Sequence, residues 1–155
     1  MLTPGDSYTE SYPAVAESVP RARAVLTGFA EDAGACGDRL HAIRLAASEA
    51  VTNAVRHAYR DRTPGAIQVS ASYLENEVWL LIADTGTGLR ARSKAPGLGL
   101  GLALIAQLAD DFQIHSRGTG GTELQMLFKL HARKPRPTGS RAQLRGSFSR
   151  AVSPA

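Results

Sequence analysis

The sequence predicts an α+β fold: a two-layer sandwich in which a mixed, mostly antiparallel sheet carries its helices on one face. Two observations predict it. First, two pairs of strand-like segments are each joined by a short turn, which is typical of antiparallel hairpins. Second, helical patterns precede the first pair and separate it from the second, which favours helices gathered on one side of the sheet.

The N-terminal third of the chain predicts one edge element and two helices. Residues 1–12 are polar and form either a frayed tail or a short edge strand. Ser18 is the expected cap of the first helix, because a serine hydroxyl can accept a bond from a free backbone N–H. Asp38 is the expected cap of the second helix, which runs to about Tyr59. The first helix has an apolar stripe of Ala24, Val25, Phe29 and Ala33.

The rest of the domain predicts four strands and a third helix. The strands are expected over residues 67–74, 77–83, 112–116 and 122–130. Glycines open the third helix, which carries Leu100, Ala103, Leu104, Gln107 and Leu108. We therefore expect one domain over residues 13–130, followed by a tail over 131–155 that is rich in Pro, Ser, Gly and Arg and is expected to be disordered.

Composition narrows the class of protein. The chain has 155 residues, and no apolar run approaches the roughly 20 residues of a membrane span, so no membrane association is expected. The start of the chain lacks the pattern of a secretory signal. Cys36 is the single cysteine, which fits a reducing, cytoplasmic setting. Without the tail, the chain holds 12 basic and 14 acidic residues, so nucleic acid is an unlikely partner of the domain.

The segment EAVTNAVRHAY places Glu49, Asn53 and His57 four residues apart on the second helix. At 100° per residue these side chains lie at the border of the apolar face, not on the outward face. The stripe is either a solvated helix flank or the edge of a site. Glu49 and Asn53 offer the hard oxygens that suit Mg²⁺, whereas His57 is better suited to packing or hydrogen bonding beside such a site. The apolar arc comprises Ile43, Ala47, Ala50, Val51, Ala54 and Ala58.

The segment DTGTG follows the second strand directly, with Asp84 at the strand end and Gly86 and Gly88 after it. A carboxylate in this place can accept a hydrogen bond from an exocyclic amine, and the glycines let a flat ring approach the backbone. The alternative is a glycine turn closed by a hydrogen bond to the aspartate side chain.

Glycines also open the third helix, at Gly97, Gly99 and Gly101. Free N–H groups and the helix dipole favour phosphate there. No strand precedes this segment and no Gly-Lys-Ser/Thr occurs, which excludes a dinucleotide fingerprint and a P-loop. A later GTGGT segment lies between the last two expected strands and is consistent with no more than a hairpin turn, and Thr122 begins the strand after it with a hydroxyl that can point inward.

The order of these motifs along the chain is specific. It resembles the GHKL ATP-binding fold of gyrase-type topoisomerases, histidine kinases and MutL-like proteins, over about residues 14–130. EAVTNAVRHAY is especially similar to the anti-sigma-factor serine kinases of bacteria. The resemblance implies that Asn53 binds a Mg²⁺ bridging the phosphates of ATP and that Glu49 is the general base. It implies nucleotide contacts for Asp84, Gly86, Gly88, Gly97, Gly99, Gly101 and Thr122, and His57 shares the helix pattern without a defined role.

The resemblance also implies a function. We expect an ATP- and Mg²⁺-dependent protein-serine kinase that sequesters a sigma factor and phosphorylates an anti-anti-sigma protein of the STAS type, acting as a homodimer. The alternative is a non-catalytic, ATP-dependent switch that only binds partners. The lid between Gly88 and Gly97 has eight residues, which is short for the family and bears on catalysis more than on binding.

Overall fold

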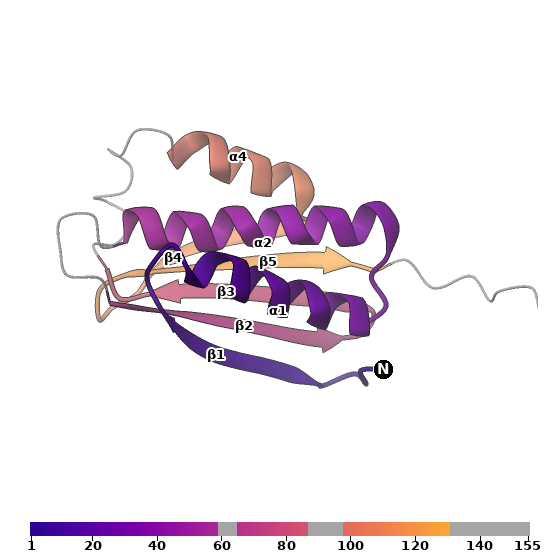
Figure 1. The fold of residues 1–155 in the computed structure, drawn as a ribbon. Helices are drawn as coiled ribbons and strands as arrows, with labels where there is room; N and C mark the ends of the chain where they lie inside the picture. The colour runs from indigo at the N-terminus through magenta and orange to yellow at the C-terminus, as the bar shows by residue number, and fades with distance from the viewer. Residues whose placement is uncertain (59–64, 87–97, 131–155) are drawn as a thin grey trace, which may run out of the picture.

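The computed structural model describes residues 1–58, 65–86 and 98–130 as one five-stranded sheet with three helices on one face (Figure 1). The strands lie in the order β1-β2-β3-β5-β4. The elements along the chain are β1 (Ser7–Pro13), α1 (Ser18–Asp32), α2 (Gly37–His57), β2 (Ala66–Leu74), β3 (Glu77–Asp84), α4 (Leu98–Leu108), β4 (Asp111–Ser116) and β5 (Thr122–Lys129).

Every pair of neighbouring strands is antiparallel. The two predicted hairpins, β2–β3 and β4–β5, are confirmed. Glu75 and Asn76 make the tight β2–β3 turn with positive φ angles of 48° and 67°, the combination that matches the twist of a two-residue hairpin. At the N-terminus the edge-strand alternative is the observed one, because β1 pairs with β2 along its whole length.

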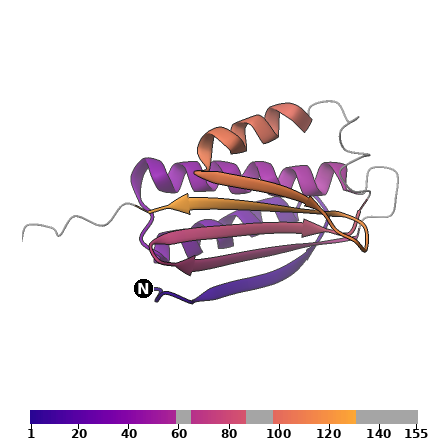
Figure 2. The ribbon, with the colours of Figure 1, turned by 180° about the vertical axis from the view of Figure 1, so that it is seen from behind.

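The core lies between the sheet and the layer of α1 and α2. Seen from behind, the sheet stands in front of these two helices, and α4 lies along α2 (Figure 2). Every second residue of β2 faces the helices, and Ile67, Val69 and Ala71 are buried, as the alternation in 67–73 predicts. All six residues of the predicted apolar arc of α2 are buried: Ile43, Ala47, Ala50, Val51, Ala54 and Ala58. The predicted α+β sandwich is therefore confirmed.

Both predicted helix caps are wrong. Ser18 is already helical and buried, and its N–H bonds the carbonyl of Val15 in the turn that precedes the helix. This turn supplies partners that a side-chain cap would otherwise supply. Asp38 lies in the first turn of α2 rather than at its cap, which is Cys36. A carboxylate in the first turn still interacts favourably with the helix dipole.

The apolar positions expected on the two flanking helices are confirmed only in part, because Phe29, Ala33 and Leu108 pack against the core but others do not. On α1 the buried stripe is Ala22, Leu26 and Ala30, whereas Ala24 is exposed. On α4 the fully buried side chain is Ile105, and Leu100 is 81% exposed. Both helices contact α2 as well as the sheet or its edge. Two neighbours rather than one therefore decide which face of each helix is buried.

Among the helices of the described residues, none is long and apolar enough to cross a membrane. The basic tail, residues 131–155, lies outside the described residues.

Candidate functional site

Most of the predicted polar site residues that the structure describes gather at one end of the sheet. β3 ends at Asp84 and its antiparallel neighbour β5 begins at Thr122, so these two side chains arrive at the same edge. The C-terminal half of α2 runs above this edge and supplies Asn53. The connection is tight, because a Cβ on Gly86 would overlap the backbone carbonyl of Ala58, directly after α2.

Glu49 and Asn53 converge on the first turn of α4. A Cβ on Gly101 would lie 3.0 Å from Nδ2 of Asn53 and 3.1 Å from Oε2 of Glu49. Glu49 is half-buried and Asn53 is only 8% exposed. Their position at the border of the buried face confirms the helical-wheel prediction. The carboxylate, the carboxamide and the backbone of a glycine-opened helix therefore form one polar group of atoms.

Two buried polar atoms at this end of the sheet have no hydrogen-bond partner within the described residues. They are Nδ2 of Asn53 and Oγ1 of Thr122, and Thr122 is 2% exposed. Leaving a buried polar group unsatisfied costs about 1–3 kcal/mol. Oxygen and nitrogen of a carboxamide are assigned from their hydrogen bonds, so Asn53 can present either atom to a ligand. A ligand with complementary polar atoms would recover this cost.

Asp84 is buried, and its Oδ1 accepts a hydrogen bond of 2.9 Å from the backbone N–H of Gly86. The alternative of an aspartate-closed glycine turn is therefore present. It is compatible with a ligand contact, because a carboxylate has two oxygens and about four acceptor directions. The turn also fixes the orientation of the Asp84 side chain at the strand end.

Two further residues, not predicted from the sequence, build this end of the sheet. Gly121 has a φ of +92°, and a Cβ there would overlap the backbone carbonyl of Asp84. Nη1 of Arg117 donates to the same carbonyl at 3.4 Å. The pair of glycines directly before Thr122 was the available signal for Gly121, because a second glycine in a hairpin turn indicates a close backbone approach. Arg117 carried no signal in its spacing.

The remaining predicted site residues are only partly described. Gly99 lies exposed in the first turn of α4, with no atom within 4 Å of a Cβ built on it. His57 is the last residue of α2, and its side chain lies outside the described part of the chain. Gly88, Gly97 and the short lid between them also lie outside it.

The donor set fits Mg²⁺ better than a metal held by protein ligands alone. Within residues 1–58, 65–86 and 98–130, no group of three His, Cys, Asp or Glu side chains could hold a metal ion. Glu49 and Asn53 nevertheless provide a carboxylate and a carboxamide oxygen beside each other. Mg²⁺ is commonly held by one or two such ligands together with waters and phosphate oxygens.

Comparison with known families agrees with this geometry. Residues 12–128 match the family described as the histidine kinase-like ATPase domain. The chain belongs to this family. Membership implies an ATP-binding domain, and the match extends from β1 to β5, which includes Glu49, Asn53, Asp84 and Thr122.

Several relatives share the name serine-protein kinase RsbW. The chain is 39% identical to that of Oceanobacillus iheyensis over 74 residues, which are 48% of this chain and 47% of the relative. It is 41% identical to that of Staphylococcus aureus over 75 residues, with the same coverage, and 34% identical to that of Listeria innocua over 87 residues, 56% of this chain and 55% of the relative. The chain thus spans about half the length of the curated relatives it matches.

A solved structure shows the same similarity in three dimensions. The chain superposes on the crystal structure of the RsbU and RsbW domains of Rv1364c from Mycobacterium tuberculosis with a TM-score of 0.65 and 26% identity. The superposition covers 82% of this chain and 33% of that one.

Proposed function

We propose that this protein is an ATP- and Mg²⁺-dependent protein-serine kinase and anti-sigma factor, which phosphorylates a STAS-type anti-anti-sigma protein. The observation that carries the proposal is the convergence of Glu49 and Asn53 on Gly101 at the α4 N-terminus. It joins a candidate base, a candidate magnesium ligand and a phosphate-binding helix start. The similarity to serine-protein kinases RsbW supports phosphoryl transfer to serine.

We assign each group of site residues to one part of the nucleotide. Asp84 and Thr122 face the adenine, where the carboxylate accepts from the amino group and the threonine hydroxyl supplies a donor. Both side chains are buried at this end of the sheet. Gly86 lies beside the ring, where its missing side chain admits the carbonyl of Ala58, and Gly99 and Gly101 present the helix start to the phosphates. Gly88, Gly97 and His57 keep the roles that the family resemblance implies.

Transfer requires an attacking hydroxyl, a leaving group and a proton acceptor. The serine oxygen of the substrate forms a bond to the γ-phosphorus while the bond to the β–γ bridging oxygen breaks, and ADP leaves with the bridging oxygen. Glu49 accepts the serine proton, directly or through water. Asn53 would hold the Mg²⁺, which would supply neutralisation of the phosphate charge, and positioning of this kind supplies most of the catalysis in phosphoryl transfer.

The partners are proposed from the same similarity. The ATP-bound protein sequesters a sigma factor in the cytoplasm. Phosphorylation of the anti-anti-sigma protein prevents the release of this sigma factor. We propose that the protein works as a homodimer, as the resembling kinases do.

The test uses the full chain, Mg²⁺, ATP labelled at the γ-phosphate and a candidate serine-bearing STAS protein. Glu49→Ala is expected to retain ATP binding and to slow transfer by about 10²–10⁴-fold, the usual contribution of a general base. Asn53→Ala is expected to abolish Mg²⁺-dependent ATP binding. Asp38→Asn is the matched control, because this carboxylate lies exposed at the other end of α2 and should change neither quantity.

Two outcomes would change the assignment. If Asn53→Ala binds Mg-ATP as tightly as the wild type, the magnesium site is wrong. If the wild type binds ATP and a sigma factor but moves no phosphate even over long incubation, the protein is the non-catalytic switch instead.

A further inference from the structure

A cavity of about 500 Å³ opens at the end of the sheet opposite to the candidate nucleotide site. Its walls come from the N-terminal segment, the C-terminal end of α1, the loop that contains Cys36 and the β2–β3 turn. Leu2, Ala33, Tyr73 and Leu130 give it an apolar floor. None of these residues takes part in the proposed kinase chemistry.

The rim of this cavity is acidic. Glu31 and Asp32 line it, and both are exposed. Within residues 1–58, 65–86 and 98–130, neither carboxylate has a hydrogen-bond or ion-pair partner. The carbonyl end of the α1 dipole points the same way, and α1 has no basic residue in its last turn. The cavity therefore combines an apolar floor with a negative rim that suits a cationic side chain with an aliphatic stem.

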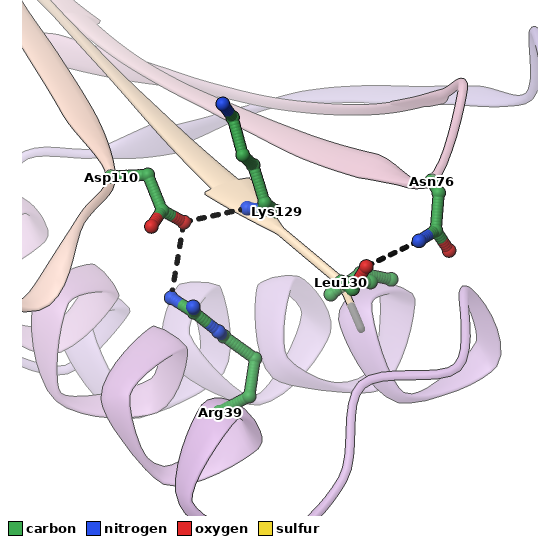
Figure 3. Close-up of polar contacts among 5 residues, drawn as sticks. All are labelled: Arg39, Asn76, Asp110, Lys129 and Leu130. Atoms are coloured by element: carbon green, nitrogen blue, oxygen red, sulfur yellow. Dashed lines mark hydrogen bonds and ion pairs between the residues drawn. The ribbon is translucent and has the colours of Figure 1, made fainter. Parts of the chain in front are cut away.

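The chain leaves the domain at this cavity, and its exit point is fixed (Figure 3). Nδ2 of Asn76 donates to the carbonyl of Leu130, and the N–H of Leu130 donates to the carbonyl of Asn76 at 2.8 Å. One residue earlier, the N–H of Lys129 donates to Oδ2 of Asp110 at 2.7 Å. Leu130 is 6% exposed and itself lines the cavity.

We propose that the segment directly after Leu130, residues 131–136, folds back into this cavity of the same chain. Its sequence is HARKPR, so Arg133, Lys134 and Arg136 bring three cations with long aliphatic stems, and the first two lie nearest to the exit point along the chain. Arg133 is three residues from the fixed exit point and can reach about 10 Å in an extended chain. A short tether of this kind corresponds to an effective concentration in the millimolar range, which is enough for a weak electrostatic contact.

This inference is independent of the proposed kinase activity. Docking pairs the first cations of the tail with the rim of Glu31 and Asp32 and covers the apolar floor with their stems. The remaining cations of the tail, Arg141 and those after it, stay outside the cavity. The contact ties the tail to the loop between α1 and α2, which carries Cys36.

Cys36 provides a native probe, because it is exposed and lines the cavity. The full chain with Pro135→Cys is oxidised at low protein concentration with oxidised glutathione, and the intramolecular disulfide to Cys36 is measured by mass spectrometry. We expect Glu31→Gln with Asp32→Asn to slow disulfide formation about five-fold, as the loss of two exposed ion pairs implies. Arg133→Gln with Lys134→Gln should slow it to the same extent.

The matched control is Glu17→Gln with Asp111→Asn, which removes two exposed carboxylates away from the cavity and should leave the rate unchanged. Each rate is divided by the rate at which Cys36 alone reacts in the same background with Pro135 retained. Equal normalised rates in all variants would show that residues 131–136 do not dock in the cavity and would overturn the proposal. So would a disulfide whose rate rises with protein concentration, because the tail would then occupy a second copy.

Discussion

The two ends of the same sheet use their polar groups in opposite ways. At the end where β5 leaves the domain, Oδ2 of Asp110 accepts from Nη1 of Arg39 at 3.1 Å and from the N–H of Lys129 at 2.7 Å (Figure 3). At the other end, buried polar atoms of Asn53 and Thr122 have no partner within the described residues. We call the first the clamp end and the second the site end.

The difference separates stability from function. The clamp end joins α2, the start of β4 and the end of β5 through satisfied bonds, which add to the free energy of unfolding. The site end carries polar groups that lower this free energy unless a ligand pairs with them. Such unsatisfied groups persist in native proteins where activity requires them. Substitutions at the two ends should therefore separate the two properties.

The largest effect is expected from Gly121→Ala, which affects both properties. Its φ of +92° is strained for alanine, and the new Cβ would overlap the carbonyl of Asp84. We expect the free energy of unfolding to fall by about 3 kcal/mol, with a loss of ATP affinity because Asp84 is displaced. Urea unfolding and ATP titration measure the two. Gly118→Ala, in the same turn with no atom within 4 Å, should change neither, and a neutral Gly121→Ala would contradict the described turn.

The next effect is expected at the clamp end from Asp110→Ala. The substitution removes the ion pair with Arg39 and the bond to the N–H of Lys129. Because the two side chains of the ion pair are 22% and 31% exposed, solvent screening reduces the loss, and we expect about 1.5 kcal/mol. ATP affinity should stay at the wild-type value. Asp111→Ala, the exposed neighbour, is the control, and a drop in ATP affinity at Asp110→Ala would break the separation of the two ends.

A smaller effect of opposite sign is expected at the site end from Thr122→Val. Valine has nearly the same shape and removes the unpartnered hydroxyl, which is 2% exposed. We expect the free energy of unfolding to rise by up to about 1 kcal/mol. If the hydroxyl contacts the nucleotide, ATP affinity falls in the same variant. A variant that loses stability would show that the Thr122 hydroxyl is satisfied in solution.

Local patterns in the sequence predicted those elements whose buried face is set by packing against a single neighbouring layer. The two hairpins follow from alternation around short turns, and the buried arc of α2 follows from the helical repeat. The stripe with Glu49 and Asn53 could be placed at the border of this arc for the same reason. These features were predictable because a single period decides which face is buried.

Other features depend on contacts that no local pattern encodes. The α1 stripe shifts to Ala22, Leu26 and Ala30 because the helix packs against both α2 and the sheet. The inward face of α4 is set by α2, where Gly101 meets Asn53. Gly121 and Arg117 act on the backbone of Asp84, which is 37 and 33 residues away in sequence, so only the fold brings them together.

The smallest effect is expected from Glu10 on β1, an exposed carboxylate that lies at neither end of the sheet. Its carboxylate accepts from the hydroxyls of Tyr8 and Tyr12, and these bonds, with a smaller contribution from Arg21, hold the pKa of Glu10 below its ordinary value. A carboxylate with a lowered folded-state pKa stabilises the protein above its unfolded pKa. This stabilisation is lost as the pH falls through the folded value.

Glu10→Gln should therefore be slightly less stable than the wild type at neutral pH. The difference should vanish in acid, where the wild-type carboxylate is protonated. Unfolding measured across the acidic range checks this, with Glu17→Gln as an exposed control. A pH-independent difference would assign the effect to packing of the tyrosines instead. A difference as large as that of Asp110→Ala would show that bonds within one edge strand stabilise the domain as much as bonds that join three elements, because Glu10 and Asp110 are both exposed.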